Sequence, residues 1–193
     1  SVETVIVDSP QRLAELLVGL KDTQALGFGI MKNGLAAAKV VTQDVLAGLK
    51  DTAGVIARTR EHFEWPAGPA WMMIDYDPRP KTEPLSDDIL LGILVEVSRD
   101  LAEAPHVLAH SASSNIYFGD EQLKGLGGRR VYFLVQDGRD IPRAGKALYQ
   151  RLWLAGHGYI AISAAGTLLD RSIVDAAVWQ PERLDFAAGA VCD

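Results

Sequence analysis

Residues 71–77 of the chain read WMMIDYD and are followed by Pro78, so four apolar side chains run directly into two aspartates spaced two apart. Side chains at i and i+2 of a β-strand point to the same face, so Asp75 and Asp77 are expected to project together from one side of a sheet, with Tyr76 on the other. Neighbouring carboxylates repel one another and raise each other's pKa, and a divalent cation relieves that repulsion. Two carboxylates together with substrate phosphates are a typical Mg²⁺ environment, which makes this segment a candidate for metal-dependent phosphoryl or nucleotidyl transfer.

A strand that ends in a turn is the alternative interpretation of the same residues. Aspartate and proline both favour turns, and a D-x-D pair often occurs by chance. The segment alone therefore leaves two possibilities open, a metal site and an ordinary junction between a strand and a turn.

The composition indicates a globular protein of 193 residues, 48% of them hydrophobic and 23% charged. This suits one domain with a sizeable core, or one domain with a small N-terminal lobe. The net charge of −6 gives no overall basic surface for nucleic acid, although a local basic cluster is compatible with it. The single cysteine, Cys192, excludes an intrachain disulfide and fits a cytoplasmic location. There is no membrane-length apolar run and no signal-peptide pattern, so no membrane partner is expected.

Capping residues and apolar periodicity predict both helices and strands in the rest of the chain. Residues that favour a helix start mark each predicted helix. Helices are expected over 10–20, after Thr42, after Ser86 and from Asp140 to about Ala155. Strands are expected at 26–32, 107–109, 115–118, 130–135 and 159–163. The two kinds of element are mixed without the regular alternation of a doubly wound sheet, which favours an α+β fold.

A serine cluster at residues 111–115, with the sequence SASSN, is a second candidate constellation. Hydroxyls and backbone N–H groups in a turn hold phosphate, which makes Ser111, Ser113 and Ser114 candidate phosphate ligands. The alternative is a polar loop whose serines bond their own backbone, and the local sequence alone favours that alternative.

A glycine-rich segment at residues 125–132, GLGGRRVY, is a third constellation. Glycines allow a close approach of backbone to ligand, and Arg129 and Arg130 are suited to bind phosphate oxygens. The glycines match neither a P-loop nor a dinucleotide fingerprint, since a strand follows them. A hairpin loop with exposed arginines explains the same residues equally well.

Asp175 is the fourth candidate, at the end of the segment LDRSIVD (169–175). It follows two β-branched residues and precedes two alanines, so we expect a confined environment in which a carboxylate needs a cation or a hydrogen-bond donor. It is a candidate third metal ligand. The alternatives are a helix cap and an ion pair with Arg171.

The order of these elements resembles the archaeo-eukaryotic primase superfamily. More narrowly, it resembles the primase-polymerase domain of phage, plasmid and mobile-element replication proteins. The family's first motif, an apolar strand ending in hDhD or hDhE, is matched by Ile74-Asp75-Tyr76-Asp77, and its late hD motif by Val174-Asp175. Within 107–190, five segments resemble sequences of the family: SASS, GGRRVY, LWLAGHG, DRSIVD and QPERLDF. The resemblance covers Trp65 to Ala190, and the order and spacing of its motifs are more specific than any one of them.

One position departs from the family's pattern. The second motif is an S-x-H-like element at the start of a strand, and Arg130 stands where its histidine is expected. That histidine is expected to contact the phosphates of the incoming nucleotide. Arginine also binds phosphate, but it is always charged and cannot exchange protons near neutral pH. The departure keeps nucleotide binding in the prediction and puts the catalytic rate in question.

The resemblance implies an α+β fold, in which an RRM-like antiparallel core (65–193) joins an N-terminal α/β unit (1–64). The whole of 1–193 is then one primase-polymerase catalytic domain, expected to be a fragment of a longer replication protein whose remainder can include a helicase domain. The implied activity is template-directed nucleotidyl transfer, as a DNA primase, a DNA polymerase or both.

The resemblance also implies a set of ligands. Asp75, Asp77 and Asp175 would bind two Mg²⁺ or Mn²⁺ ions, while Arg130, Arg129 and the serines would contact the triphosphate. The partners would be DNA template and primer with NTP or dNTP. Two other functions stay open: a non-catalytic nucleotide- or nucleic-acid-binding module on the same fold, and a D-x-D metal-dependent phosphoesterase.

Overall fold

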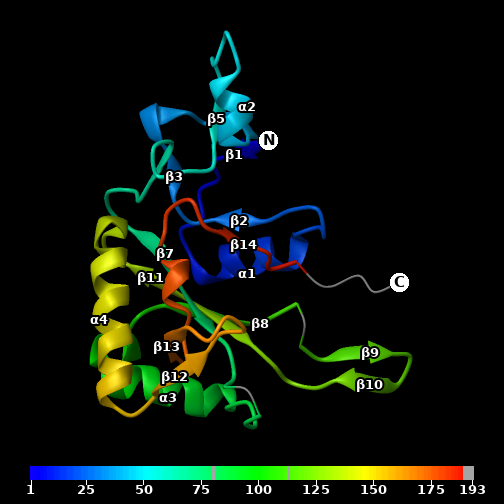
Figure 1. Ribbon diagram of the computed structural model, residues 1–193, viewed down its shortest axis with the longest axis vertical. Helices are drawn as coiled ribbons and strands as arrows, with labels where there is room; N and C mark the ends of the chain where they lie inside the picture. The colour runs from blue at the N-terminus through cyan, green and yellow to red at the C-terminus, as the bar shows by residue number, and fades with distance from the viewer. Residues whose placement is uncertain (80, 113, 189–193) are drawn as a thin grey trace.

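A three-stranded antiparallel sheet, ordered β7-β11-β8, organises the protein (Figure 1). The structure is a computed structural model, and it describes residues 1–79, 81–112 and 114–188. Strand β11 (Arg129–Val135) lies between β7 (Ala70–Tyr76) and β8 (His106–His110). The apolar run expected as a strand is thus β7, and all of its residues except Asp75 are buried. A strand buried on both faces is expected to read as a continuous apolar run, as this one does.

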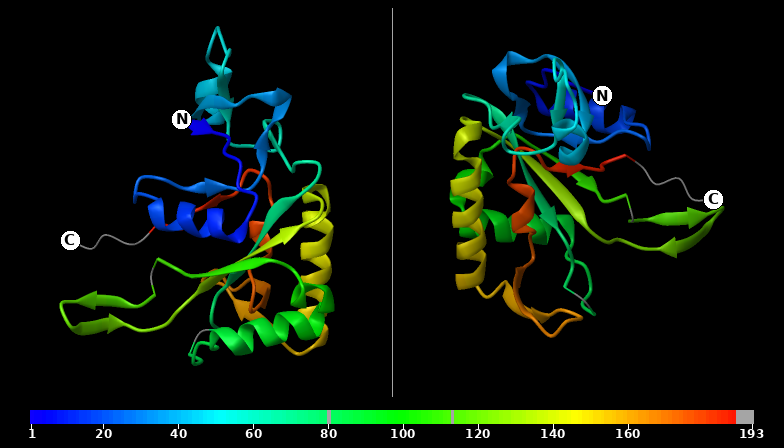
Figure 2. Two further views of the ribbon diagram at one scale, coloured as in Figure 1. Left: turned by 180° about the vertical axis from the view of Figure 1, so that it is seen from behind. Right: turned by 45° about the horizontal axis from the view of Figure 1, so that its top comes forward.

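Different elements cover the two faces of this sheet. Helices α3 (Asp87–Val97) and α4 (Ile141–Leu154) lie on one face, and α1 (Pro10–Gly19) lies on the other (Figures 1 and 2). The main core accordingly combines apolar residues of β7 and β11 with buried leucines of all three helices, among them Leu13, Leu94 and Leu152. Successive residues of a strand point to opposite faces, so alternate side chains of a strand contact the helices on one face and the elements on the other.

The early part of the chain also builds a second, smaller core. Strand β4 (Ala37–Val41) pairs antiparallel with β1 (Val2–Glu3) and parallel with β5 (Val55–Ala57), while β3 (Ile30–Met31) pairs with β6 (Phe63–Glu64). We call these five strands the small lobe. Its buried residues are Met31, Ala38, Ile56 and Phe63. Residues 1–64 contribute to both cores, because α1 packs into the main one.

The helix starts anticipated from the sequence carry side-chain caps. The hydroxyl of Ser9 accepts a hydrogen bond from Arg12 N at 3.3 Å, that of Thr42 from Val45 N at 3.3 Å, and that of Ser86 from Ile89 N at 3.4 Å. Each bond satisfies a backbone donor that has no partner within the helix. The predictions of helices at α1, α2 (Gln43–Ala47) and α3 are confirmed, and α4 occupies the span expected for the fourth.

The single strand predicted at 26–32 is wrong, because the structure divides it into two strands with different partners. Strand β2 (Leu26–Gly27) pairs with β14 (Leu184–Asp185), near the end of the described chain, whereas β3 joins the small lobe. Gly29 lies at the break, and a Cβ there would collide with Pro181. The chain therefore changes from one sheet to another where only glycine fits.

The remaining elements complete an α+β fold, as predicted. The hairpin of β9 (Ile116–Phe118) and β10 (Glu121–Lys124) extends away from the main body (Figure 1). Strands β12 (Gly158–Ile162) and β13 (Leu168–Ser172) form another hairpin. Short 3₁₀ turns occur at η1 (Lys32–Gly34), η2 (Arg99–Ala102), η3 (Gly138–Asp140) and η4 (Ala176–Val178). Within the described residues, none of the helices combines the length and the apolar character needed to cross a membrane.

Candidate functional site

Backbone hydrogen bonds bring Asp75, Asp77 and Asp175 to one place. The N–H of Asp175 donates to the carbonyl oxygen of Asp75 at 2.9 Å, and the N–H of Asp77 donates to Ile173 O at 3.3 Å. Between these two bonds, Tyr76 and Val174 form an isolated antiparallel bridge. The segment that carries Asp175 thus runs beside the end of β7, although the two are far apart in sequence. The backbones of the three residues predicted as one group therefore lie together.

Arg130 faces Asp75 across the sheet. The two residues are paired in the register of β11 and β7 and therefore lie on the same face, where the guanidinium Nε is 4.0 Å from Asp75 Oδ1. A closer partner is Asp185 of β14, whose Oδ1 is 2.7 Å from the same nitrogen. Two carboxylates, one on each side, hold the arginine at the position where the family's pattern expects histidine.

Asp185 was not among the predicted site residues, and it is only 2% exposed. Its second carboxylate oxygen accepts a 2.6 Å hydrogen bond from the hydroxyl of Tyr132. One sequence signal could have identified it: an acidic residue between Leu184 and Phe186, in a stretch that otherwise suits a buried strand. What the sequence does not show is that β14 returns to pair with β2 beside the site.

The pKa values of the site's acids reflect burial and like charge. Burial raises the pKa of Asp75 to about 6; Arg130 opposes that rise, and the charges of Asp77, Asp185 and Asp175 add to it. Burial also raises the pKa of Asp185, against the Tyr132 hydrogen bond and the Arg130 charge. Three other carboxylates therefore act on Asp75, and an added cation would lower their mutual repulsion.

A cavity of about 320 Å³ opens beside these residues, at the lower end of the size range of small-molecule sites. Asp75, Arg130 and Asp185 line it together with two further arginines, Arg58 and Arg183. Its apolar wall consists of Met73, Val178, Leu184 and Phe186. Three arginines around one cavity suit a ligand with several phosphate oxygens.

Arg58 and Arg183 were not predicted, because neither belongs to a motif for which the sequence predicts a ligand. Arg58 follows β5 of the small lobe, and its guanidinium donates to the carbonyl oxygen of Glu182 at 3.3 Å. Arg183 follows directly and precedes β14. Only the packing of the small lobe against this late segment brings the two arginines to one cavity.

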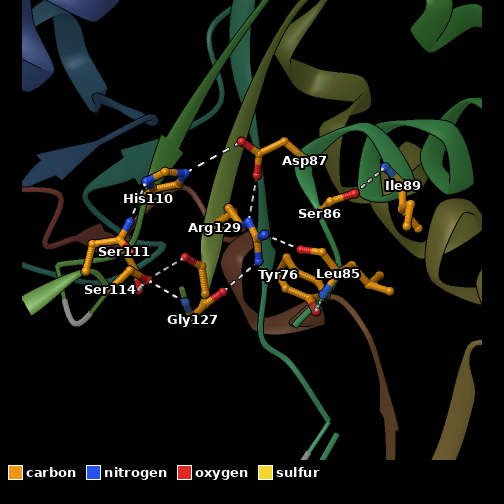
Figure 3. A network of polar contacts seen from close by, with 12 residues as sticks. Tyr76, Leu85, Ser86, Asp87, Ile89, His110, Ser111, Ser114, Gly127 and Arg129 are labelled. Atoms are coloured by element: carbon orange, nitrogen blue, oxygen red, sulfur yellow. Dashed lines mark hydrogen bonds and ion pairs between the residues drawn. The ribbon is translucent and has the colours of Figure 1, made fainter. Parts of the chain in front are cut away.

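Arg129 lies on the opposite face of the sheet, where it is fully buried (Figure 3). Its guanidinium donates to Asp87 Oδ1 at 2.8 Å, to Gly127 O at 2.8 Å and to Leu85 O, and it stacks over the ring of Tyr76. Adjacent residues of a strand point to opposite faces, so Arg129 and Arg130 cannot both face the cavity. The role that these contacts support is to fix α3 to the sheet, and we leave Arg129 out of the proposed site.

Ser111 and Ser114 pack against the glycine loop before β11 (Figure 3). The two hydroxyls are 2.9 Å apart, and Ser114 Oγ donates to Gly128 O and accepts from Gly127 N, both at 3.1 Å. A Cβ on Gly128 would come within 3.3 Å of both the Asp77 carboxylate and Ser111 Oγ. The serines thus shape the loop beside Asp77. Ser113, the third predicted serine, lies outside the described residues.

The carboxylates have the right chemistry for a hard divalent cation, but they do not form a ready-made cage. Within the described residues, no three His, Cys, Asp or Glu side chains converge closely enough to hold a metal ion. Asp175 Oδ1 instead accepts a 2.9 Å hydrogen bond from Ala177 N, and Arg130 stands beside Asp75. Binding of Mg²⁺ or Mn²⁺ here would require these side chains to rotate.

Comparisons of this chain with protein-family models, with curated proteins and with solved structures found no match.

Proposed function

We propose that the protein is a nucleotidyltransferase that extends a nucleic-acid strand on a template, as a primase, a DNA polymerase or both. The observation that carries this proposal is the backbone-bonded group of Asp75, Asp77 and Asp175 beside Arg130 at a cavity lined by three arginines. Acids that bind divalent cations and cations that bind phosphates are the two requirements of this chemistry.

Asp75, Asp77 and Asp175 are the proposed ligands of two Mg²⁺ or Mn²⁺ ions. When bound, such ions lower the pKa of an attacking 3′-hydroxyl and stabilise a leaving pyrophosphate. The carboxylates hold this charge at the end of β7, where backbone hydrogen bonds join it to residues 173–175. Little covalent chemistry is then asked of the protein, since positioning and charge neutralisation supply most of the rate.

Arg130, Arg58 and Arg183 are the proposed ligands of the triphosphate. Asp185 orients Arg130 through its 2.7 Å ion pair, and Tyr132 in turn fixes Asp185. An oriented guanidinium binds two phosphate oxygens at once. Because arginine stays protonated, Arg130 stabilises charge and does not exchange a proton with the substrate.

The test is de novo synthesis and primer extension with NTPs and dNTPs separately, in Mg²⁺ and in Mn²⁺. Wild-type protein is expected to incorporate nucleotides, and the double variant Asp75→Asn with Asp77→Asn is expected to lose all metal-dependent incorporation. The matched control is Asp22→Asn with Asp120→Asn, which changes the net charge equally at two exposed positions. Wild-type rates in the Asp75/Asp77 variant would show that the proposed mechanism is wrong.

A non-catalytic nucleotide- or nucleic-acid-binding module is the second candidate. It is favoured by the absence of a converged three-ligand metal group in the described residues and by the arginine beside Asp75. Binding of labelled nucleotide and primer-template in Mn²⁺ without incorporation would support it. Release of a nicked or hydrolysed product would instead support a metal-dependent phosphoesterase.

A further inference from the structure

A second cavity, of about 260 Å³, lies next to the first. Segment 176–186 forms part of the wall of both: Val178 and Leu184 line the first, and Ala176, Trp179 and Gln180 line the second. The other residues of the second cavity come from α4 and from the chain between β5 and β6, and they are Arg60, Pro142, Lys146 and Tyr149. Two of its lining residues are cations, and none of those described is acidic.

The cations of the two cavities form one basic track. Arg58 lines the first cavity and Arg60 the second, and Glu182 holds both: its carbonyl accepts from Arg58, and its carboxylate pairs with Arg60 Nε at 3.2 Å. Lys146 is exposed and has no hydrogen bond or ion pair within the described part of the chain. Among the residues that line the two cavities, five are cations and two, Asp75 and Asp185, are acids, although the whole protein carries −6. Such a local excess attracts a polyanion.

A buried hydrogen bond connects the wall of the second cavity to the strand that carries Asp75. Trp179 Nε1 donates to the carbonyl oxygen of Met73 at 2.9 Å, two residues before Asp75 on β7. Residue 176 directly follows Asp175. The segment that lines the second cavity therefore begins beside Asp175 and is bonded to β7 close to Asp75.

From these contacts we infer that the second cavity binds the phosphate backbone of single-stranded nucleic acid and directs that strand toward Asp75. The inference rests on the proposed function and adds the residues that hold the strand. Arg60 and Lys146 neutralise successive phosphates, and the half-buried ring of Tyr149 gives a surface on which a base stacks. A free nucleotide shares the phosphate chemistry, so the experiment has to separate the two sources.

The experiment measures binding of a fluorescein-labelled oligothymidylate by anisotropy across a salt series. Lys146→Gln is expected to weaken binding about 3- to 10-fold and to reduce the slope of log K against log salt by about 0.7, the value for one lost contact to a single strand. Lys50→Gln is the matched control, because Lys50 is also exposed, makes no polar contact among the described residues and lies away from both cavities. It is expected to behave as wild type. Equal effects of the two substitutions would overturn the inference.

Two further measurements identify the ligand. Unlabelled oligonucleotide is expected to compete far better than dTTP; competition by dTTP alone at equal strength would assign the cavity to free nucleotide and overturn the inference. In primer extension, Lys146→Gln is expected to raise the KM for the primer-template strand and to leave the KM for dNTP unchanged.

The outcome is separable from that of the proposed function. The variant Asp75→Asn with Asp77→Asn is expected to retain the Lys146-dependent strand binding while it loses incorporation. If the wild-type protein binds the strand through Lys146 but incorporates no nucleotide, the proposed function fails and the strand site stands. If the wild-type protein incorporates nucleotides and Lys146→Gln leaves both strand affinity and KM unchanged, the strand site fails alone.

Discussion

Arg130 contacts two carboxylates at different distances, 2.7 Å to Asp185 and 4.0 Å to Asp75, and this difference assigns them different roles. Asp185 is buried, accepts a hydrogen bond from Tyr132 and forms the closer ion pair with the guanidinium. Asp75 is more exposed and remains accessible from the cavity, with 22% of its side chain exposed. A cation that bound Asp75 would therefore leave the main anchor of Arg130 intact.

Loss of the Asp185 side chain is expected to destabilise the protein. Asp185→Ala leaves the buried hydroxyl of Tyr132 without its acceptor and a nearly buried arginine without its close anion, which together cost about 3 kcal/mol. Urea denaturation measures the change. Asp140→Ala is the control, because it breaks an exposed ion pair with Arg143 and is expected to change stability little. Similar losses in the two variants would contradict a structural role for Asp185.

The raised pKa of Asp75 predicts a pH dependence of stability. Its pKa rises from the usual 3.8 to about 6, so between these values the folded state binds more protons than the unfolded state. Stability contributed by this group is therefore present below about pH 4 and falls as the pH rises to about 6, by at most about 3 kcal/mol. Asp75→Asn should remove that loss and be the more stable protein at pH 7. Denaturation curves of both proteins from pH 4 to 7 test this, and parallel profiles would refute it.

At the scale of elements, the parts governed by local chemistry were predictable from the sequence. Ser9, Thr42 and Ser86 cap helices because the side-chain oxygen and the backbone N–H that donates to it are three residues apart, which is a local relation. The division of 26–32 between two sheets was not predictable in the same way. It depends on β14 and on Pro181, which approach from the far end of the chain.

Two helical glycines with opposite surroundings give a prediction at this scale. A Cβ on Gly145 of α4 would collide with the ring of Trp179, whereas a Cβ on Gly92 of α3 meets nothing within 4 Å. Gly145→Ala is expected to destabilise by about 1–3 kcal/mol, because the ring cannot move without breaking its bond to Met73 O. Gly92→Ala is expected to stabilise by about 0.5–1 kcal/mol through helix propensity alone. Thermal denaturation of both variants checks the signs, and two changes of the same sign would contradict this packing.

At the scale of the whole molecule, the candidate site joins segments that are distant in sequence. The family resemblance grouped Asp75, Asp77 and Asp175 through the order of its motifs, and the structure places the backbones of these three residues together. Arg58, Arg183 and Asp185 could not be found that way, since their roles come from how the small lobe and β14 pack around the cavity. The structure also shows why Arg129 differs from Arg130: side chains alternate along β11, so Arg129 points to α3. The sequence alone did not predict which of the two arginines faces Asp75, because that depends on how β11 pairs with β7.

The two cores predict two levels of protection from solvent. The small lobe has four buried apolar residues, Met31, Ala38, Ile56 and Phe63, whereas β7 and β11 lie within the much larger main core. Regions with little buried apolar surface open at lower free energy. Backbone amides of β4 and β5 are therefore expected to exchange with deuterium faster than those of β7 and β11, as mass spectrometry would measure. Equal protection of the two sets would indicate a single cooperative unit.

The pairing of β14 with β2 has a consequence for the order in which the protein is made. By the time a ribosome has added β8 and β11, the chain already contains the whole central sheet, and Arg130 has its place in it. Asp185 is translated more than fifty residues later than that arginine, on the strand that finally closes against Leu26 and Gly27. A nascent chain can therefore acquire its sheet before it acquires the anion that orients its arginine. A chain that has not yet added β14 therefore lacks the buried anion beside Arg130 and one wall of the first cavity.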